Sequence, residues 1–362
     1  MKKILIVSNM YPSSEYPHYG VFVKNTEDIL IEDGFLVDRS VMYKQVGIIK
    51  KILSYSSFYI RTICMMVFSK YDFIYVHFAS LSSVPVLFAN KLSSSKIVVN
   101  VHGNDLIPET KKDEKYRKIV QKILNVSEMI ISPSQYFTNV IINDFHISEE
   151  KIVDFPSGGV NNNIFYPMDK KEAISKMKLD DSKFYLGFIS RLEANKGWDT
   201  FLRAYKKILE REPSKNIEIV VVGDGNDKTA FLSLLNELSI SSRVHYYPLL
   251  GQNEINVILN CIDVFCFPTN RKSESLGLIG LEAMATRTLV VANNSFGPSS
   301  YMESGKNGIC FNENDPDVLY EAIIRAMNLS KTERESFLSN AFKTSHEYSV
   351  SNQKKYLIDV FK

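Results

Sequence analysis

Two glutamates bracket an otherwise apolar, glycine-containing stretch of the chain. The sequence SESLGLIGLEAM covers residues 273–284, and its two acids are Glu274 and Glu282. A buried carboxylate without a partner is costly, so such a segment either keeps its acids at the surface or holds them for a ligand. In a continuous helix the two acids would lie about 12 Å apart along the axis, too far to share one atom. They could instead contact two hydroxyl-bearing parts of one elongated ligand.

The beginning of the same stretch favours anion binding. A polar loop, NRKSES, leads into the helical sequence LGLIGLEAMAT. The first turn of a helix has free backbone N–H groups and a partial positive charge, and Gly277 would let an anion come close to them. The alternative is that both glutamates only complement the helix N-terminus, and this segment alone does not decide between the two interpretations.

A second stretch, SRLEANKGWDTF, carries two cations in a loop between a strand and a helix. Arg191 and Lys196 are five residues apart there. Arginine can bind phosphate oxygens through two parallel hydrogen bonds, and lysine adds a point charge. A solvated pair of loop charges is the alternative. Together with an anion-binding helix terminus in the same domain, the two residues predict a diphosphate clamp.

Two further candidates lie in the first half of the chain. His102, in VNVHGND, follows a strand and precedes Gly103, which permits a sharp turn toward the expected ligand cleft. Gly20, in YPHYGVF, could come near a ligand in the loop after the first strand. A structural histidine and an ordinary turn glycine are the alternatives, but ligands of parallel sheets bind at the carboxyl ends of strands.

The elements that must position these residues form a repeating pattern. Short runs rich in valine and isoleucine alternate with helix-length amphipathic segments, which is typical of parallel sheets covered on both faces. The predicted strands are KILIVSN, LVDRSVMY, DFIYVHF, KIVVNVHG, EMIISPS and IVDFPSG in the first half, then FYLGFIS, IEIVVVGDG, VHYYPL, DVFCFPT and TLVVANN. The pattern predicts an α/β protein with two doubly wound Rossmann-like domains that face across a cleft.

The expected domains are residues 1–166 and 167–345, followed by a helix at 346–362 that packs back on the first domain. The polar residues 166–183 are interpreted as the interdomain linker. A formal charge of +2 argues against an electrostatic nucleic-acid binder. The four scattered cysteines are typical of buried thiols, and no apolar stretch is long enough to span a membrane.

Two other strings suggest sites but have simpler explanations. GDG at 223–225 lacks the third glycine of a dinucleotide fingerprint, so we interpret it as a tight turn. DPD at 315–317 has paired carboxylates that could hold a metal ion. Asp315 followed by Pro316 is, however, the usual sequence of a helix N-cap with proline at the first helical position.

In these motifs the chain resembles the family 4 glycosyltransferases of GT-B architecture over nearly its whole length. The resemblance rests on Glu274 and Glu282 as an E-x7-E element, RLEANKG, HGND, PSGGVNNNIFYP and GKNGICF, taken in this order and spacing. It implies a retaining glycosyltransferase that needs no metal or other cofactor. The implied donor is a nucleotide-sugar, with UDP favoured over GDP, and the implied acceptor is a glycan or lipid-linked glycan in bacterial polysaccharide synthesis, such as capsule or O-antigen.

The resemblance also implies a role for each candidate residue. Glu282 would bind the ribose hydroxyls, and Arg191 and Lys196 would neutralise the departing diphosphate. His102 would contact the transferred sugar, and Gly20 would line the site near the phosphates. The donor sugar and phosphate would be held by Glu274, Ser275, Leu276, Gly277 and Leu278.

Two rival functions share this architecture: a nucleotide-sugar epimerase and a non-catalytic nucleotide-sugar-binding subunit. The expected location is the cytoplasm. The run IIKKILSYSSFYIRTICMMVF mixes Lys50, Lys51 and Arg61 with large apolar residues, as a helix on an anionic membrane surface would. It would then bring the enzyme to the inner face of the plasma membrane. A plain core helix is the alternative.

Overall fold

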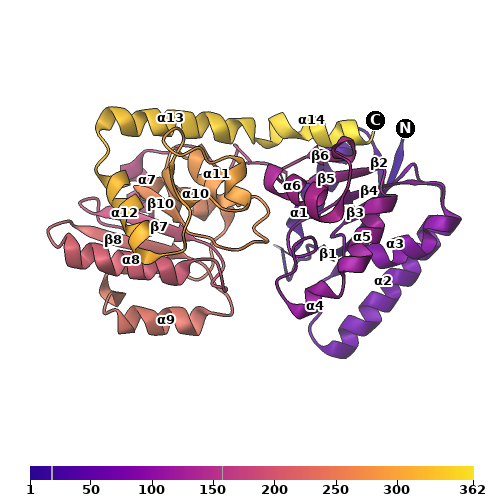
Figure 1. Cartoon of the computed structure of the whole chain (residues 1–362), viewed down its shortest axis with the longest axis horizontal. Coiled ribbons are helices and arrows are strands. Elements are labelled where there is room, and N and C mark those ends of the chain that lie inside the picture. Colours follow the sequence, from indigo (N-terminus) through magenta and orange to yellow (C-terminus); the bar gives the residue numbers. More distant parts are fainter. Residues whose placement is uncertain (18, 157) are drawn as a thin grey trace. The chain divides into compact units, whose positions relative to one another are not determined.

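The computed structural model describes residues 1–17, 19–156 and 158–362. The chain divides into two compact units, which are coloured along the sequence in Figure 1. The first unit contains Met1–Gly158 and Gln353–Lys362, and the second contains Gly159–Asn352. Each unit has a six-stranded sheet in which all paired strands are parallel.

The first sheet has the strand order β2-β1-β3-β4-β5-β6. Its strands are β1 (Lys3–Tyr11), β2 (Leu36–Tyr43), β3 (Phe73–His77), β4 (Lys96–Asn100), β5 (Met129–Ser132) and β6 (Ile152–Asp154). The helices of this unit are α1 (Val21–Glu32), α2 (Ile48–Phe68), α3 (Ser83–Ala89), α4 (Lys111–Glu114), α5 (Arg117–Val126) and α6 (Gln135–Phe145).

The second sheet has the order β12-β11-β10-β7-β8-β9. Its strands are β7 (Phe184–Ile189), β8 (Ile217–Val222), β9 (Val244–Tyr247), β10 (Val264–Phe267), β11 (Leu289–Asn293) and β12 (Ile309–Phe311). The helices are α7 (Lys170–Met177), α8 (Trp198–Arg211), α9 (Lys228–Glu237), α10 (Gln252–Cys261), α11 (Leu278–Ala285), α12 (Pro316–Met327) and α13 (Lys331–Glu347), and α14 (Val350–Val360) follows.

The burial of the strands shows that helices cover both faces of each sheet. Every residue of β3 and of β11 is buried, as expected for strands that lie between two layers of helices. All eleven predicted strands are confirmed. The additional strand, β12, has three residues and was not predicted.

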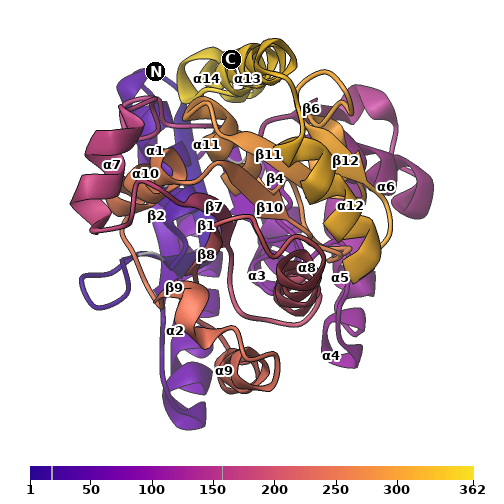
Figure 2. The same cartoon turned by 90° about the vertical axis from the view of Figure 1, so that its left-hand side faces the viewer.

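The strand order determines where a ligand can bind in each unit. In the second sheet, β7 pairs with β10 on one side and with β8 on the other, so the direction of winding reverses between β7 and β10 (Figure 2). In the first sheet the reversal lies between β1 and β3. Loops that leave the carboxyl ends of strands at such a switch point flank a crevice in open α/β sheets.

The chain passes between the units earlier than the sequence indicated. Residues 159–166 belong to the second unit, where Phe165 is buried and the Tyr166 backbone N–H donates to Asn256 Oδ1 at 3.1 Å. The supposed linker contains helix α7, capped by Asp169 and buried at Ala173 and Ile174. Its many charges lie on the solvent side and conceal this short apolar face in the sequence.

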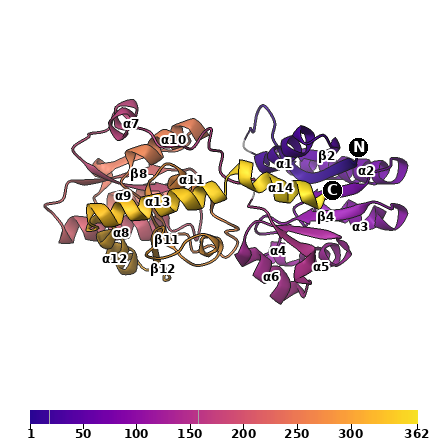
Figure 3. The ribbon, with the colours of Figure 1, turned by 90° about the horizontal axis from the view of Figure 1, so that it is seen from above.

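The C-terminal segment is helical, and Figure 3 follows it through the two yellow helices α13 and α14. Residues from Gln353 onward belong to the first unit. There the Phe361 ring packs edge-on against Phe73 and Tyr75, with ring centroids 5.3 and 5.1 Å apart. The division therefore falls inside α14 and not at residue 346.

Helix α2 buries a narrow stripe on the first unit. Phe58, Thr62 and Met66 are its buried residues, so Phe58 and Met66 belong to the core and do not face solvent. Its exposed apolar residues are instead Ile48, Ile49, Ile52, Leu53, Ile60 and Phe68, each at least 60% exposed. Among the described residues, no helix combines the length and apolarity that a membrane crossing requires.

The cysteines differ from one another in exposure. Cys261 and Cys266 are buried and Cys310 is partly buried, whereas Cys64 is exposed on α2. The prediction of four buried thiols is therefore wrong for Cys64, which lies on the solvent side of a helix whose buried stripe is narrow.

Candidate functional site

In the second unit, the loops that follow β7 and β10 are held together by their backbones. The Asn270 N–H donates to the Asn195 carbonyl at 2.8 Å. Gly197 packs so closely on this partner loop that a Cβ there would lie 2.1 Å from the Pro268 carbonyl oxygen. Gly197 is also the N-cap of α8 and has a left-handed backbone with φ of 78°. Only glycine satisfies both conditions without strain.

This contact brings together two of the predicted site residues. The Lys196 Nζ lies 2.6 Å from Glu274 Oε2, and the Thr269 hydroxyl donates to the same oxygen at 3.0 Å. The two paired side chains are only 9% and 14% exposed. Burial alone would raise the pKa of Glu274, but Lys196 and Thr269 together hold that pKa below its ordinary value. Glu274 is therefore ionised and fixed in position at neutral pH.

Arg191 lies at the edge of this loop pair, and 61% of its side chain is exposed. It contacts Glu193 at 2.9 Å, and Glu193 also binds Arg271 at 3.3 Å. The sequence motifs did not single out Glu193 or Arg271 as site residues. Arg271 lies in the quoted loop NRKSES, and its signal was a second cation just before a helix N-terminus. Arg191, Lys196 and Arg271 are thus each paired with a carboxylate of these loops, either Glu193 or Glu274.

The string GDG, which the sequence suggested was only a turn, supports the loop that carries Arg191. A Cβ on Gly223 would lie 1.9 Å from the Ser190 carbonyl oxygen, and one on Gly225 would lie 2.3 Å from the Leu192 carbonyl oxygen. The Leu192 N–H donates to the Asp224 carbonyl at 3.0 Å. The two glycines therefore let the loops after β7 and β8 pack backbone against backbone.

The predicted anion site at the start of α11 has the expected backbone. Gly277 is the N-cap with φ of 79°, and a Cβ there would lie 2.5 Å from the Phe267 ring. Tyr301 donates a hydrogen bond to the Gly277 carbonyl at 2.9 Å and so fixes this turn. The N–H groups of Leu278 and Ile279 stand in the first turn, where a helix supplies no acceptor. Leu276 is buried beneath the turn, while Ser275 is partly exposed.

Glu282 lies on the same helix, which is buried on all sides along most of its length. Its side chain has no ion-pair partner among the described residues, and burial raises its pKa to about 8. Burying a carboxylate in this way is costly unless a ligand supplies hydrogen bonds to it. This buried environment fits the prediction that Glu282 binds a ribose. It fits less well the alternative that Glu282 is a surface charge that complements the helix N-terminus.

In the first unit, His102 is part of a chain of hydrogen bonds. The Thr26 hydroxyl donates to the Val23 carbonyl at 2.9 Å, so it accepts from His77 Nε2, which lies 3.2 Å away. His77 Nδ1 is then an acceptor, and it lies 3.1 Å from His102 Nε2. It follows that His102 carries its proton on Nε2 and keeps Nδ1 as an acceptor. His77 was not singled out in the sequence, because only the fold places it next to His102.

The turn that carries His102 is built around a buried carboxylate. Asp105 accepts hydrogen bonds from the backbone N–H groups of His102, Gly103 and Ala79, at 3.0, 2.7 and 2.9 Å respectively. Burial lowers the pKa of His102 to about 3. His102 is consequently neutral near pH 7, and it is suited to accept a hydrogen bond and not to donate a proton.

Gly20 lies in the same unit, where it is the N-cap of α1 with φ of 77°. A Cβ on Gly20 would lie 2.7 Å from the Met10 carbonyl carbon, so the turn packs directly on the end of β1. The Phe22 ring, two residues later, lies 4.3 Å from the His102 ring. The ends of β1 and β4 are therefore joined through Phe22 and His102. The other predicted site residues belong to the second unit.

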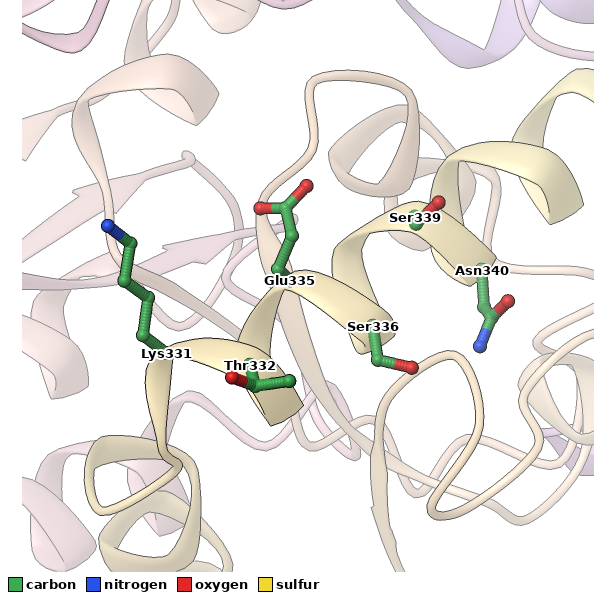
Figure 4. Close-up of a pocket in the computed structure, with 6 residues that line it drawn as sticks. All are labelled: Lys331, Thr332, Glu335, Ser336, Ser339 and Asn340. Carbon is green, nitrogen blue, oxygen red and sulfur yellow. The ribbon is translucent and has the colours of Figure 1, made fainter.

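The hollow on α13 and the string DPD contain none of the predicted site residues. A hollow on α13 is lined by residues of that helix alone, among them Lys331, Glu335 and Asn340 (Figure 4). Asp315 caps α12 by accepting the Asp317 and Val318 N–H groups, which confirms the N-cap interpretation of DPD. In the part of the chain that the structure describes, no three His, Cys, Asp or Glu side chains gather as metal ligands.

Comparison with known families gives this geometry a context. Residues 169–344 match the model of the family described as Glycosyl transferases group 1. The match lies within the second unit, which is therefore similar to group 1 glycosyltransferases. This unit contains Lys196, Glu274 and Glu282 together with the loops that join them.

Curated glycosyltransferases show the same similarity over part of their length. A D-inositol 3-phosphate glycosyltransferase of Rhodococcus opacus is 24% identical over 194 residues, which are 52% of this chain and 43% of the relative. The chain spans less than two thirds of the length of several such relatives.

Solved structures show the fold of both units. Sucrose-phosphate synthase from Thermosynechococcus elongatus superimposes with a TM-score of 0.82 at 14% identity, covering 100% of this chain and 98% of that one. The Anabaena HepE protein, in complex with UDP-glucose, has a TM-score of 0.79 at 16% identity, with 99% of each chain covered. The fold prediction of two Rossmann-like domains of GT-B type is confirmed.

Proposed function

We propose that this protein is a retaining glycosyltransferase that transfers a sugar from a nucleotide-sugar, with a uridine nucleotide favoured. The observation that carries the proposal is Glu282, a buried carboxylate that has no ion-pair partner among the described residues and lies on a helix whose N-cap, Gly277, supplies no side-chain cap. A nucleoside diphosphate supplies both missing partners, because its ribose hydroxyls donate hydrogen bonds and its phosphates accept them. The UDP-glucose in the HepE structure favours uridine as the base.

The cations of the second unit would stabilise the leaving group. Transfer breaks the bond between the sugar's anomeric carbon and the diphosphate oxygen, so negative charge grows on that oxygen. Lys196 is held ready by Glu274, and Arg191 and Arg271 are held by Glu193. Positive groups that are fixed before the reaction stabilise such a charge without reorganisation. In the same proposal, His102 accepts a hydrogen bond from the transferred sugar, and Gly20 lies near the phosphates.

Nucleotide binding tests this proposal directly. A ligand that binds only the folded protein raises its melting temperature, so UDP, GDP and ADP can be compared by thermal shift. We expect UDP to give the largest shift and Glu282→Gln to reduce it. If none of the three diphosphates stabilises the protein at millimolar concentration, the proposal is wrong.

We expect EDTA to leave most of the transfer activity intact. The reason is the protein-derived set of cations, Lys196, Arg191 and Arg271, beside the α11 N-terminus. The assay measures turnover after dialysis against the chelator, with and without added magnesium or manganese. Complete loss on chelation and recovery with either ion would contradict this expectation.

We further propose that the acceptor is a glycan or a lipid-linked glycan used in bacterial surface polysaccharide, and that α2 meets an anionic membrane. At the N-terminal end of α2, Ile48, Ile49, Ile52 and Leu53 are all exposed, and Lys50 and Lys51 stand among them. Exposed aliphatic side chains beside lysines are what an interfacial helix presents to acidic headgroups.

The membrane proposal predicts that the protein sediments with vesicles containing phosphatidylglycerol at low salt. Changing both Lys50 and Lys51 to glutamate should abolish sedimentation, and Ile49→Ser with Ile52→Ser should weaken it. Ile31→Ser on α1, a residue that is also 51% exposed, is the matched control. Failure of the unmutated protein to sediment, together with full activity on a water-soluble acceptor, would show that α2 has no membrane role.

A further inference from the structure

The first unit contains a pocket that none of the predicted site residues line. Its volume is about 480 Å³. It is bounded by the ends of β1 and β2, by α2 and by α4 with the residues that follow it. Its lining includes the five tyrosines Tyr19, Tyr43, Tyr55, Tyr59 and Tyr116 and the three lysines Lys44, Lys51 and Lys112. No carboxylate is present among the described lining residues.

One wall of the pocket is a face of α2. Lys51, Tyr55 and Tyr59 are spaced by four residues, so their side chains lie one above another along the helix. The Tyr55 and Tyr59 rings pack edge to face with centroids 5.9 Å apart. This wall is aromatic and basic, whereas the exposed apolar surface of the same helix is mainly aliphatic.

The two tyrosines of this wall are fixed in place. The Tyr55 hydroxyl accepts a hydrogen bond from Asn9 Nδ2 at 3.2 Å, and the Tyr59 hydroxyl donates to the Leu81 carbonyl at 3.2 Å. Burial raises the pKa of both phenols, so both remain neutral. The rings therefore offer an ordered aromatic surface with polar groups at its edge, which suits the mixed apolar and polar faces of a sugar ring.

The lysines give the pocket an uncompensated positive charge. Neither Lys51 nor Lys112 forms an ion pair with any described residue, and Lys44 lies over the Tyr16 ring at 4.3 Å. With three cations and no acid in the lining, the pocket favours an anionic ligand.

We propose that this pocket binds a sugar ring that carries an acidic group, either a carboxylate or a phosphate, and that this sugar is part of the acceptor. The acceptor role rests on the proposed glycosyltransferase function, whereas binding of the acidic sugar does not. The tyrosines contact the ring, and Lys51 and Lys112 bind the acidic group.

The test measures dissociation constants by ligand-observed NMR with the full-length protein and three soluble probes. The probes are methyl glucuronoside, glucose 6-phosphate and methyl glucoside, which share a ring and differ in charge. We expect the two acidic probes to bind about tenfold or more tightly than the neutral one, as hydrogen bonds to charged groups imply. The stronger of the two acidic probes identifies the acidic group. Tyr55→Ala should weaken binding of all three.

Charge reversal on α2 and α4 supplies matched controls. Lys51→Glu and Lys112→Glu should each remove the preference for acidic probes, while Lys50→Glu and Lys111→Glu should leave it unchanged, because these neighbouring lysines do not line the pocket. Equal affinity for acidic and neutral probes, or equal effects of Lys50→Glu and Lys51→Glu, would overturn the proposal. Binding of phosphatidylglycerol vesicles without binding of either acidic sugar would overturn it too.

The same samples separate this proposal from the glycosyltransferase function. If UDP, GDP and ADP all fail to bind but the acidic sugars bind as described, the pocket assignment stands and the proposed donor chemistry does not. If a diphosphate binds and the acidic sugars do not, the reverse holds. Lys51→Glu should keep the unmutated response to the diphosphate, because the predicted nucleotide contacts belong to the second unit.

Discussion

Lys196→Ala is expected to lower turnover by roughly 100-fold or more, the scale seen when one group that stabilises transition-state charge is removed. Lys196 is buried and is paired with Glu274, which alanine would leave without its cation. Removing one partner of a buried pair is destabilising, so the melting temperature should also fall. Turnover must therefore be measured below that temperature, with circular dichroism to show that the variant is folded.

Arg191→Ala gives a cleaner form of the same experiment, because the arginine side chain is mostly exposed and its loss should leave the fold intact. We expect a loss of turnover of similar size. Arg203→Ala, at an exposed arginine of α8, is the matched control. Near-normal turnover in both Lys196→Ala and Arg191→Ala would show that these residues do not form a diphosphate clamp.

Glu282→Ala is expected to weaken binding of the nucleoside diphosphate by about 1 to 3 kcal/mol, which corresponds to lost hydrogen bonds to a charged acceptor. The bare diphosphate suffices, because the predicted contact is with the ribose. Unchanged affinity in a calorimetric titration would show that Glu282 does not bind the nucleotide.

The raised pKa of Glu282 adds a pH dependence with a definite sign. Ribose hydroxyls donate to the ionised carboxylate, so binding favours loss of the proton that the free protein holds up to about pH 8. Affinity should therefore rise with pH, by at most about tenfold per unit, and level off above pH 8. Glu282→Gln should flatten this part of the profile, and the part that remains reports the titration of the phosphate itself.

The raised pKa of Glu282 also predicts how the stability of the ligand-free protein changes with pH. Between the ordinary carboxyl pKa of 4.5 and the raised value of about 8, the folded protein holds a proton that the unfolded chain has lost. Its contribution to stability is therefore complete below pH 4.5 and is lost as the pH rises toward 8. Glu282→Gln should remove this slope from denaturation curves.

The fold could be predicted from the sequence because each buried parallel strand is a continuous apolar run. DFIYVHF and TLVVANN need no tertiary information to be recognised, since both faces of these strands meet helices. Helix α7 was missed because its buried face is little more than Ala173 and Ile174 within a charged segment. Local composition cannot distinguish such a helix from a linker.

The candidate site was only partly predictable, for a similar reason. Residue types and spacing identified Lys196, Glu274 and Glu282, but not the direct pairing of Lys196 with Glu274, which depends on how two loops distant in sequence pack. The sequence did not identify His77 for the same reason, since only the fold places it next to His102. On α2, hydrophobicity alone could not separate Phe58, which is buried, from Ile52, which is exposed.

The most direct test of the central claim follows the fate of a nucleotide-sugar by NMR. UDP-glucose and other nucleotide-sugars are incubated with the protein and a sugar acceptor, and both the nucleotide and the anomeric signals are recorded. We expect free nucleoside diphosphate to accumulate, the sugar to appear on the acceptor with its anomeric configuration retained, and Lys196→Ala to slow both. A nucleotide-sugar that is returned epimerised without release of diphosphate, or that remains unchanged with every donor, would contradict the central claim.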